Sequence, residues 1–213
     1  LLPQVFEAPP AGLRIRMCLE APTATVDPLI VEGVRGVARA LEALGHHVEE
    51  IGPFGGTLDE FLPVYQNLAA GAPTLTDASL QPVTRWLRAA GRKVPLSQAQ
   101  KLQAEFQARA LAWFGDADLV LSPTTPCFAP RVGAFDGMEP EAAFRAAADL
   151  GAFTAVFNAS GQPAASVPMG TGGPDTLPMG AQLVGPPGGD VRVLQVARQL
   201  QGALGWVERR APG

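Results

Sequence analysis

The chain has 213 residues, of which 47% are hydrophobic and 17% are charged, and its formal net charge is −4. This composition can bury a sizeable core and excludes a chain that is disordered throughout. A net negative charge without any basic cluster longer than two residues argues against a nucleic-acid-binding protein. No apolar run approaches the ~20 residues of a membrane helix, so we expect no membrane contact and a cytoplasmic location.

The N-terminal residues 1–4 lack the positive charge of a signal peptide, and the sequence starts without Met, which we interpret as the mark of a longer parent protein. The two cysteines, Cys18 and Cys127, are far apart and form no metal-binding or redox motif. No glycine-rich phosphate motif or cluster of metal ligands is present in the sequence, so we predict that no cofactor is bound.

The first third of the chain predicts a β-α-β unit. Residues 13–19 are typical of a strand, Asp27 and Pro28 of a helix start, and Gly45 of a helix end. Residues 48–51 predict a second strand. We therefore expect two parallel strands joined by a right-handed crossover.

The middle third predicts helices. Two pairs have capping-box spacing, Thr57 with Glu60 and Ser97 with Gln100, and a shorter helix is predicted over residues 82–90. Helical spacing predicts two buried stripes. The first consists of Phe61, Val64, Tyr65 and Leu68, and the second of Leu102, Phe106, Ala110 and Trp113.

The last part of the chain alternates strands with helices. Residues 118–121 predict a buried strand, and residues 164–168 and 179–184 predict an antiparallel hairpin with a loose loop. Helices are predicted over residues 141–150, 153–158 and 190–204. The sequence thus predicts a single α/β unit over residues 1–213, with a mixed, mostly parallel sheet flanked by helices.

Common catalytic patterns are missing from the sequence. The only histidines, His46 and His47, are predicted to lie in a surface turn, and no G-x-S-x-G motif is present. Asp116 and Asp118 flank a strand and are interpreted as caps of the preceding helix. The only lysines, Lys93 and Lys101, lie in the helical middle, where we expect a solvated face.

Three ordered segments carry a family resemblance: Asp118–Pro126 (DLVLSPTTP), Phe153–Gly170 (FTAVFNASGQPAASVPMG) and Leu177–Pro186 (LPMGAQLVGP). Together they resemble the C-terminal half of the amidase signature family. Residues 80–85 and 91–92 are similar to the branch that contains the 6-aminohexanoate cyclic-dimer hydrolases. One departure is Thr176, which stands where the family usually has Gly.

The resemblance implies an amide hydrolase in which a Ser–cisSer–Lys triad cleaves the C–N bond and backbone N–H groups hold the oxyanion. In the family, the triad belongs to a Gly/Ser-rich stretch of the N-terminal half, and this chain contains no such stretch. We therefore assign no catalytic residue, Ser160 and Ser166 included. The expectation is a C-terminal part that is inactive alone and supplies sheet and cleft wall for a small amide substrate.

Ligands of open α/β sheets bind outside the carboxyl ends of the strands. The loop that leaves the strand at 118–121 therefore supplies the best candidates for substrate contact, and a second group follows it. These candidates are Thr124, Thr125, Pro126, Cys127, Phe153, Asn158 and Gln162. The alternative for Thr124 to Cys127 is a buried turn stiffened by proline. For Asn158 the preferred interpretation is a structural cap that holds the turn by side-chain-to-backbone bonds.

A second hypothesis stays open, namely a self-contained α/β module that binds a small ligand or a partner chain without catalysis. If the chain is part of a larger sheet, it exposes an apolar face, and two copies are expected to pair as a homodimer. Neither hypothesis specifies the substrate.

Overall fold

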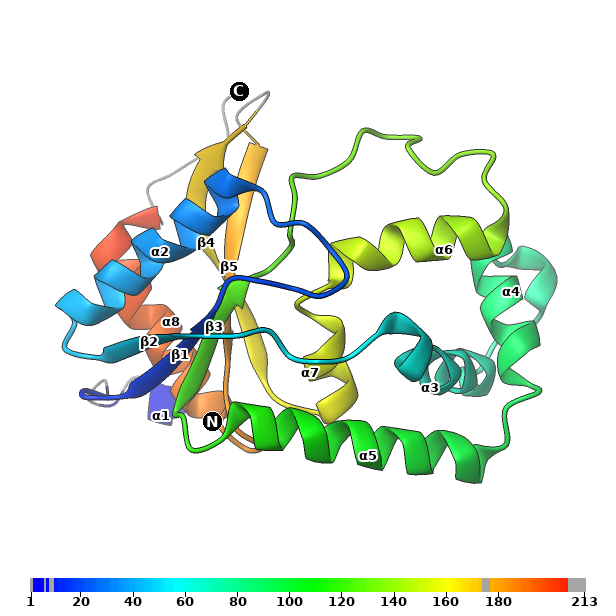
Figure 1. Cartoon of the computed structure of the whole chain (residues 1–213), viewed down its shortest axis with the longest axis horizontal. Helices are drawn as coiled ribbons and strands as arrows, with labels where there is room; N and C mark the ends of the chain where they lie inside the picture. Colours follow the sequence, from blue (N-terminus) through cyan, green and yellow to red (C-terminus); the bar gives the residue numbers. More distant parts are fainter. Residues whose placement is uncertain (1, 6, 8–9, 174–176, 207–213) are drawn as a thin grey trace.

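The computed structural model describes residues 2–5, 7, 10–173 and 177–206. In this part of the chain a five-stranded sheet is covered by helices on both faces (Figure 1). In chain order the elements are α1 (Leu2–Val5), β1 (Arg14–Cys18), α2 (Pro28–Ala43), β2 (His47–Ile51), α3 (Leu58–Gly71), η1 (Asp77–Ser79), α4 (Pro82–Gly91), α5 (Leu96–Phe114), β3 (Leu119–Pro123), α6 (Pro140–Ala148), η2 (Asp149–Gly151), α7 (Ala155–Ser160), β4 (Ala164–Gly172), β5 (Leu177–Val184) and α8 (Asp190–Leu204).

The strand order is β2-β1-β3-β5-β4. β1 runs parallel to β2 and to β3, whereas β5 runs antiparallel to β3 and to β4. The predicted β-α-β unit and the antiparallel hairpin are confirmed, as is an α/β fold with a mixed sheet. β2 and β4 form the two edges.

Successive side chains of each strand point to opposite faces of the sheet, and each face has its own hydrophobic core. Ile15 and Met17 of β1 face α2 and α8, together with Leu119 and Leu121 of β3. Val120 of β3 points to the opposite face, where α3, α5 and α7 pack. The α2 and α8 layer lies on one side of the sheet in Figure 1, and the helices α3, α4, α5, α6 and α7 lie on the other.

Local chemistry explains where the helices begin and end. The Asp27 carboxylate accepts a hydrogen bond from the Leu29 N–H at 2.8 Å, and Pro28 occupies the first helical position of α2. The Thr57 hydroxyl accepts from the Glu60 N–H at 3.4 Å and begins α3. The second predicted capping box is wrong, because α5 begins at Leu96 without a side-chain cap.

Two burial predictions are also wrong in part. On α3, Phe61 and Val64 are buried, but Tyr65 and Leu68 are 45% and 57% exposed. His46 is not in a surface turn, because its ring is 3% exposed. Its Nδ1 accepts from the Leu13 N–H at 3.3 Å.

Candidate functional site

A pocket of about 90 Å³ opens at the carboxyl ends of β1 and β3, on the sheet face that carries α5 and α7. Cys18 ends β1 and Ser122 lies near the end of β3, and both line the pocket. The remaining wall comes from the loop at residues 20–23, the 52–57 loop and the helical layer, and it is rich in aromatic side chains. Its six rings belong to Phe54, Phe61, Phe106, Trp113, Phe153 and Phe157.

The rings of this pocket brace one another. Phe54 meets Phe106 edge-to-face at 5.1 Å between centroids and meets Trp113 at 6.0 Å. Trp113 in turn lies 6.4 Å from Phe157. Such edge-to-face pairs contribute about 0.5–1.5 kcal/mol each beyond their burial. The aromatic wall is therefore a preformed surface that suits an apolar group.

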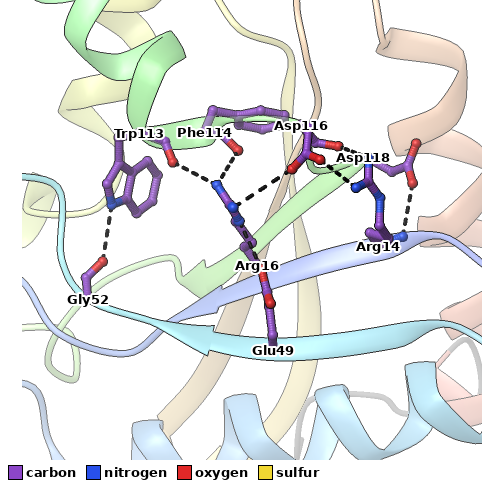
Figure 2. A network of polar contacts seen from close by, with 8 residues as sticks. All are labelled: Arg14, Arg16, Glu49, Gly52, Trp113, Phe114, Asp116 and Asp118. Atoms are coloured by element: carbon purple, nitrogen blue, oxygen red, sulfur yellow. Dashed lines mark hydrogen bonds and ion pairs between the residues drawn. The ribbon is translucent and has the colours of Figure 1, made fainter.

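A network of hydrogen bonds holds Trp113 in place (Figure 2). Its indole Nε1 donates to the Gly52 carbonyl at 3.1 Å, and its own carbonyl accepts from the Arg16 guanidinium at 3.2 Å. Arg16 also donates to the Phe114 carbonyl at 3.1 Å, so one side chain of β1 satisfies two of the last carbonyls of α5. Gly115 has φ +64°, and any Cβ there would overlap this guanidinium.

Asp116 and Asp118 do not cap α5, contrary to the sequence prediction. Asp116 pairs with Arg14 at 2.5 Å, and the Asp118 carboxylate accepts from the Arg14 N–H at 2.9 Å and from Arg192 at 2.8 Å. The hydrogen bond from Arg14 holds the pKa of Asp116 below its usual range. These contacts join β1, β3 and α8 at the amino ends of the parallel strands.

A larger cavity of about 420 Å³ lies beside this network, at the end of the strands opposite the aromatic pocket. Arg14, Arg16 and Glu49 line it, but Arg14 is paired with Asp116, and Arg16 with Glu49 at 2.9 Å. Its charges are therefore satisfied within the protein. The smaller aromatic pocket is the better candidate site, because ligands of α/β sheets bind at the carboxyl ends of strands.

The four loop residues predicted to contact substrate lie just beyond β3, and none of them lines the aromatic pocket. The Thr124 hydroxyl bonds to the Ser166 hydroxyl at 2.7 Å, and the Thr125 hydroxyl donates to the Cys127 carbonyl at 3.0 Å. Pro126 is buried, and its carbonyl accepts from the Asp27 N–H at 2.8 Å. The loop thus ties β3 to the start of α2.

Cys127 is partly buried. Burial raises the pKa of its thiol, and the charges of Asp149 and Asp27 raise it further. The thiol therefore stays protonated at neutral pH and is a poor nucleophile.

The second predicted group is dispersed. Phe153 is buried and lines the pocket, and its carbonyl accepts from the Gln182 side chain at 3.2 Å. Asn158 is exposed on α7. Gln162 is buried, accepts from the Ser160 hydroxyl at 2.9 Å and donates to the Gly185 carbonyl at 3.0 Å. Of the seven predicted residues, Phe153 is thus the one that lines the pocket.

Cys18, Ser122 and Trp113 also line the pocket, and none of them was predicted from the sequence as a site residue. Cys18 was within reach of the rule applied to β3, because it ends the neighbouring parallel strand. Within the described residues, no group of three His, Cys, Asp or Glu side chains is arranged to hold a metal ion. Nor is any helix in that part of the chain long and apolar enough to span a membrane.

Known proteins resemble this chain over almost all of its length. The 6-aminohexanoate-cyclic-dimer hydrolase of Paenarthrobacter ureafaciens is 31% identical over 228 residues, which covers 94% of this chain and 46% of that protein. A glutamyl-tRNA(Gln) amidotransferase component from Azotobacter vinelandii is 29% identical over 240 residues, which covers 96% of this chain and 48% of that protein. The chain therefore spans about half the length of these relatives.

Solved structures agree. A 6-aminohexanoate cyclic dimer hydrolase complexed with substrate superposes with a TM-score of 0.79 at 30% identity, over 97% of this chain and 48% of that one. A bacterial aryl acylamidase shares the fold, with a TM-score of 0.72 at 20% identity. The sequence profile of the amidase family matches residues 3–194. Since that match covers most of the sequence, the chain belongs to the amidase family.

Proposed function

We propose that this chain is the C-terminal part of an amide hydrolase, and that it contributes part of the sheet and one wall of the substrate cleft. The observation that carries the proposal is the extent of the match. The chain is covered to 94%, but the relative with 31% identity is covered only to 46%. A catalytic apparatus in the other half of such a protein explains why no triad motif occurs here.

In this proposal the Ser–cisSer–Lys triad lies outside the chain. The two lysines offer no alternative, because both are exposed, and Lys101 lies on α5 with its Nζ 3.9 Å from Glu105. The wall consists of the loop from Thr124 to Cys127 together with Phe153. Asn158, exposed on α7, remains a proposed substrate contact, whereas Gln162 is a buried support for the turn after α7.

The rings of the aromatic pocket would shape the apolar side of the cleft. Since the triad is placed elsewhere, we expect the chain alone to hydrolyse no amide. The test is to incubate the purified chain with simple primary amides and measure ammonia release and, with hydroxylamine, hydroxamate formation. Turnover that survives repurification would refute the proposed inactivity.

The parent gene gives an independent test of the hydrolase itself. The frame upstream of Leu1 is expected to encode a Lys followed by a Gly/Ser-rich stretch. Supplying that segment in trans, or restoring it in one chain, is expected to give amidase activity. A parent frame without such a segment would count decisively against an amide hydrolase.

A non-catalytic ligand-binding module is the second candidate function. It is favoured by the aromatic pocket, whose rings contact one another and form a preformed apolar surface within this chain. Self-association is a further proposal, supported by the exposed Tyr65 and Leu68 on α3. Sedimentation of the purified chain tests it, and a monomer at all accessible concentrations contradicts it.

A further inference from the structure

The charged side chains that line the aromatic pocket are all negative. Glu20 and Asp149 line it and are exposed, and its lining, as far as the structure describes it, contains no basic side chain. Neither carboxylate forms an ion pair within the described residues. Glu20 and Asp149 are therefore negative charges at this pocket that are available to a ligand.

The charge of each carboxylate also raises the pKa of a cysteine thiol near it. Burial raises the pKa of the Cys18 thiol at the pocket floor, and the charge of Glu20 adds to the shift. Asp149 acts in the same way on Cys127. Two cations lie beside the pocket, and both are paired. Arg109 lies 5.5 Å from the Phe106 ring centroid and pairs with Glu60 at 2.5 Å. Arg16 donates to the Trp113 carbonyl and pairs with Glu49 at 2.9 Å.

We propose that this pocket binds a small alkylammonium group, with the alkyl chain among the aromatic rings and the ammonium at the mouth facing Glu20 and Asp149. The size argues for a short chain, because the cavity of about 90 Å³ is smaller than the ~150 Å³ cavity that accommodates benzene in another protein. The negative faces of the rings also favour a cation near them over an anion.

The proposal names the ligand class of the cleft described above, so as a statement about substrate it rests on the proposed amide-hydrolase function. In that setting the preferred amides would carry a protonated amine on a short aliphatic arm. Binding is measured without hydrolysis. A loss of binding therefore refutes this inference alone, and an inactive parent protein refutes the proposed function alone.

The first experiment titrates the full 213-residue chain at pH 7 with n-butylammonium, with butyrate as the matched anion. An alkylamine is protonated at this pH, as lysine is. The readout is the indole N–H signal of Trp113 in ¹⁵N-correlated NMR spectra, assigned with Trp113→Phe. The signal of Trp86, which does not line the pocket, is the internal control.

We expect the Trp113 signal to shift with a dissociation constant on the order of 1 mM for n-butylammonium, because so small a ligand makes few contacts. The affinity for butyrate is expected to be at least tenfold lower. High salt is expected to narrow this difference. Equal binding of cation and anion would overturn the proposal.

Variants separate the charge from the shape of the pocket. Glu20→Gln and Asp149→Asn are each expected to weaken n-butylammonium binding about two- to fivefold, as befits exposed ion pairs. Glu42→Gln removes one exposed carboxylate from α2, away from the pocket lining, and is expected to change nothing.

Ala152→Leu, on the lining, is expected to abolish binding by filling the cavity, whereas Ala108→Leu on the exposed side of α5 leaves it intact. Circular dichroism establishes that each variant is folded. Unchanged binding in Ala152→Leu, or in the double variant Glu20→Gln with Asp149→Asn, would refute the site. The charge variants keep the test valid even if the leucine variant fails to fold.

Discussion

Gly91, at the end of α4, lies very close to α3. At this position the packing of the two helices and the helix propensity of alanine have opposite effects on the stability of Gly91→Ala. A Cβ built at Gly91 would overlap the carbonyl oxygen of Gln66 in α3 and would lie 3.0 Å from the Ala70 Cβ. Alanine is favoured over glycine within helices by about 0.5–1 kcal/mol, so propensity alone predicts that Gly91→Ala stabilises. The overlap is with backbone rather than with a flexible side chain, so α3 and α4 must separate.

Overpacking of this kind costs about 1–3 kcal/mol. The helices are also clamped by Arg88, which is buried and donates to the carbonyls of Ala69 and Ala72. We therefore expect the clash to exceed the propensity gain, with Gly91→Ala lowering the free energy of unfolding by about 2 kcal/mol. For a chain of this size that corresponds to a fall in Tm of about 4–8 °C.

Gly36 in α2 is the matched control, because a Cβ there meets only the Arg39 guanidinium at 3.8 Å. Gly36→Ala is expected to raise the free energy of unfolding by about 0.5–1 kcal/mol. Urea unfolding followed by circular dichroism measures both variants. The reasoning fails if Gly91→Ala is as stable as the parent chain or if both variants shift in the same direction.

Three further predictions use single side chains. The hydrogen bond from Arg92 lowers the pKa of Asp77. The stabilisation from the ionised Asp77 carboxylate is therefore present at neutral pH and is lost as the pH falls through that lowered pKa. Below about pH 4, the urea midpoint of Asp77→Asn should fall less steeply with pH than that of the parent chain. Asp27→Ala should lower the unfolding free energy by about 1 kcal/mol, and Asp27→Ser should restore most of it. Gln182→Leu should cost about 1–3 kcal/mol by leaving the buried Phe153 carbonyl unpaired, and a neutral effect in urea unfolding would contradict this.

The fold was predictable where the signals are local. Asp27, Pro28 and Gly45 mark the ends of α2 in the sequence, and the predicted strands at residues 164–168 and 179–184 correspond to β4 and β5. Contacts between distant residues were not predictable. His46 is buried because Leu13 and Gln199 supply partners, and Gln199 lies 153 positions along the chain.

The sequence predicts a site at the carboxyl ends of the strands, and the aromatic pocket opens at the carboxyl ends of β1 and β3. The rule of strand carboxyl ends led to the loop after β3, where Thr124 and Thr125 are engaged in bonds to the protein. The pocket instead lies between Cys18 of β1, Ser122 of β3 and the rings of the helical layer and the 52–57 loop. Hydrogen bonds to Arg16 and Gly52 hold Trp113, at the end of α5, in the pocket wall. The spacing of apolar residues along α5 does not predict these contacts.

Both edges of the sheet carry features that oppose aggregation. β4 contains Pro168, which has no N–H to offer a neighbouring strand, and its pairing with β5 becomes irregular between Pro168 and Gly170. β2 carries Glu49 and Glu50, which pair with Arg16 and Arg35, so a second copy at that edge would meet charged side chains held in ion pairs. Uncontrolled growth of the sheet into fibrils is therefore disfavoured, and association of this chain with itself is directed toward its helical surfaces.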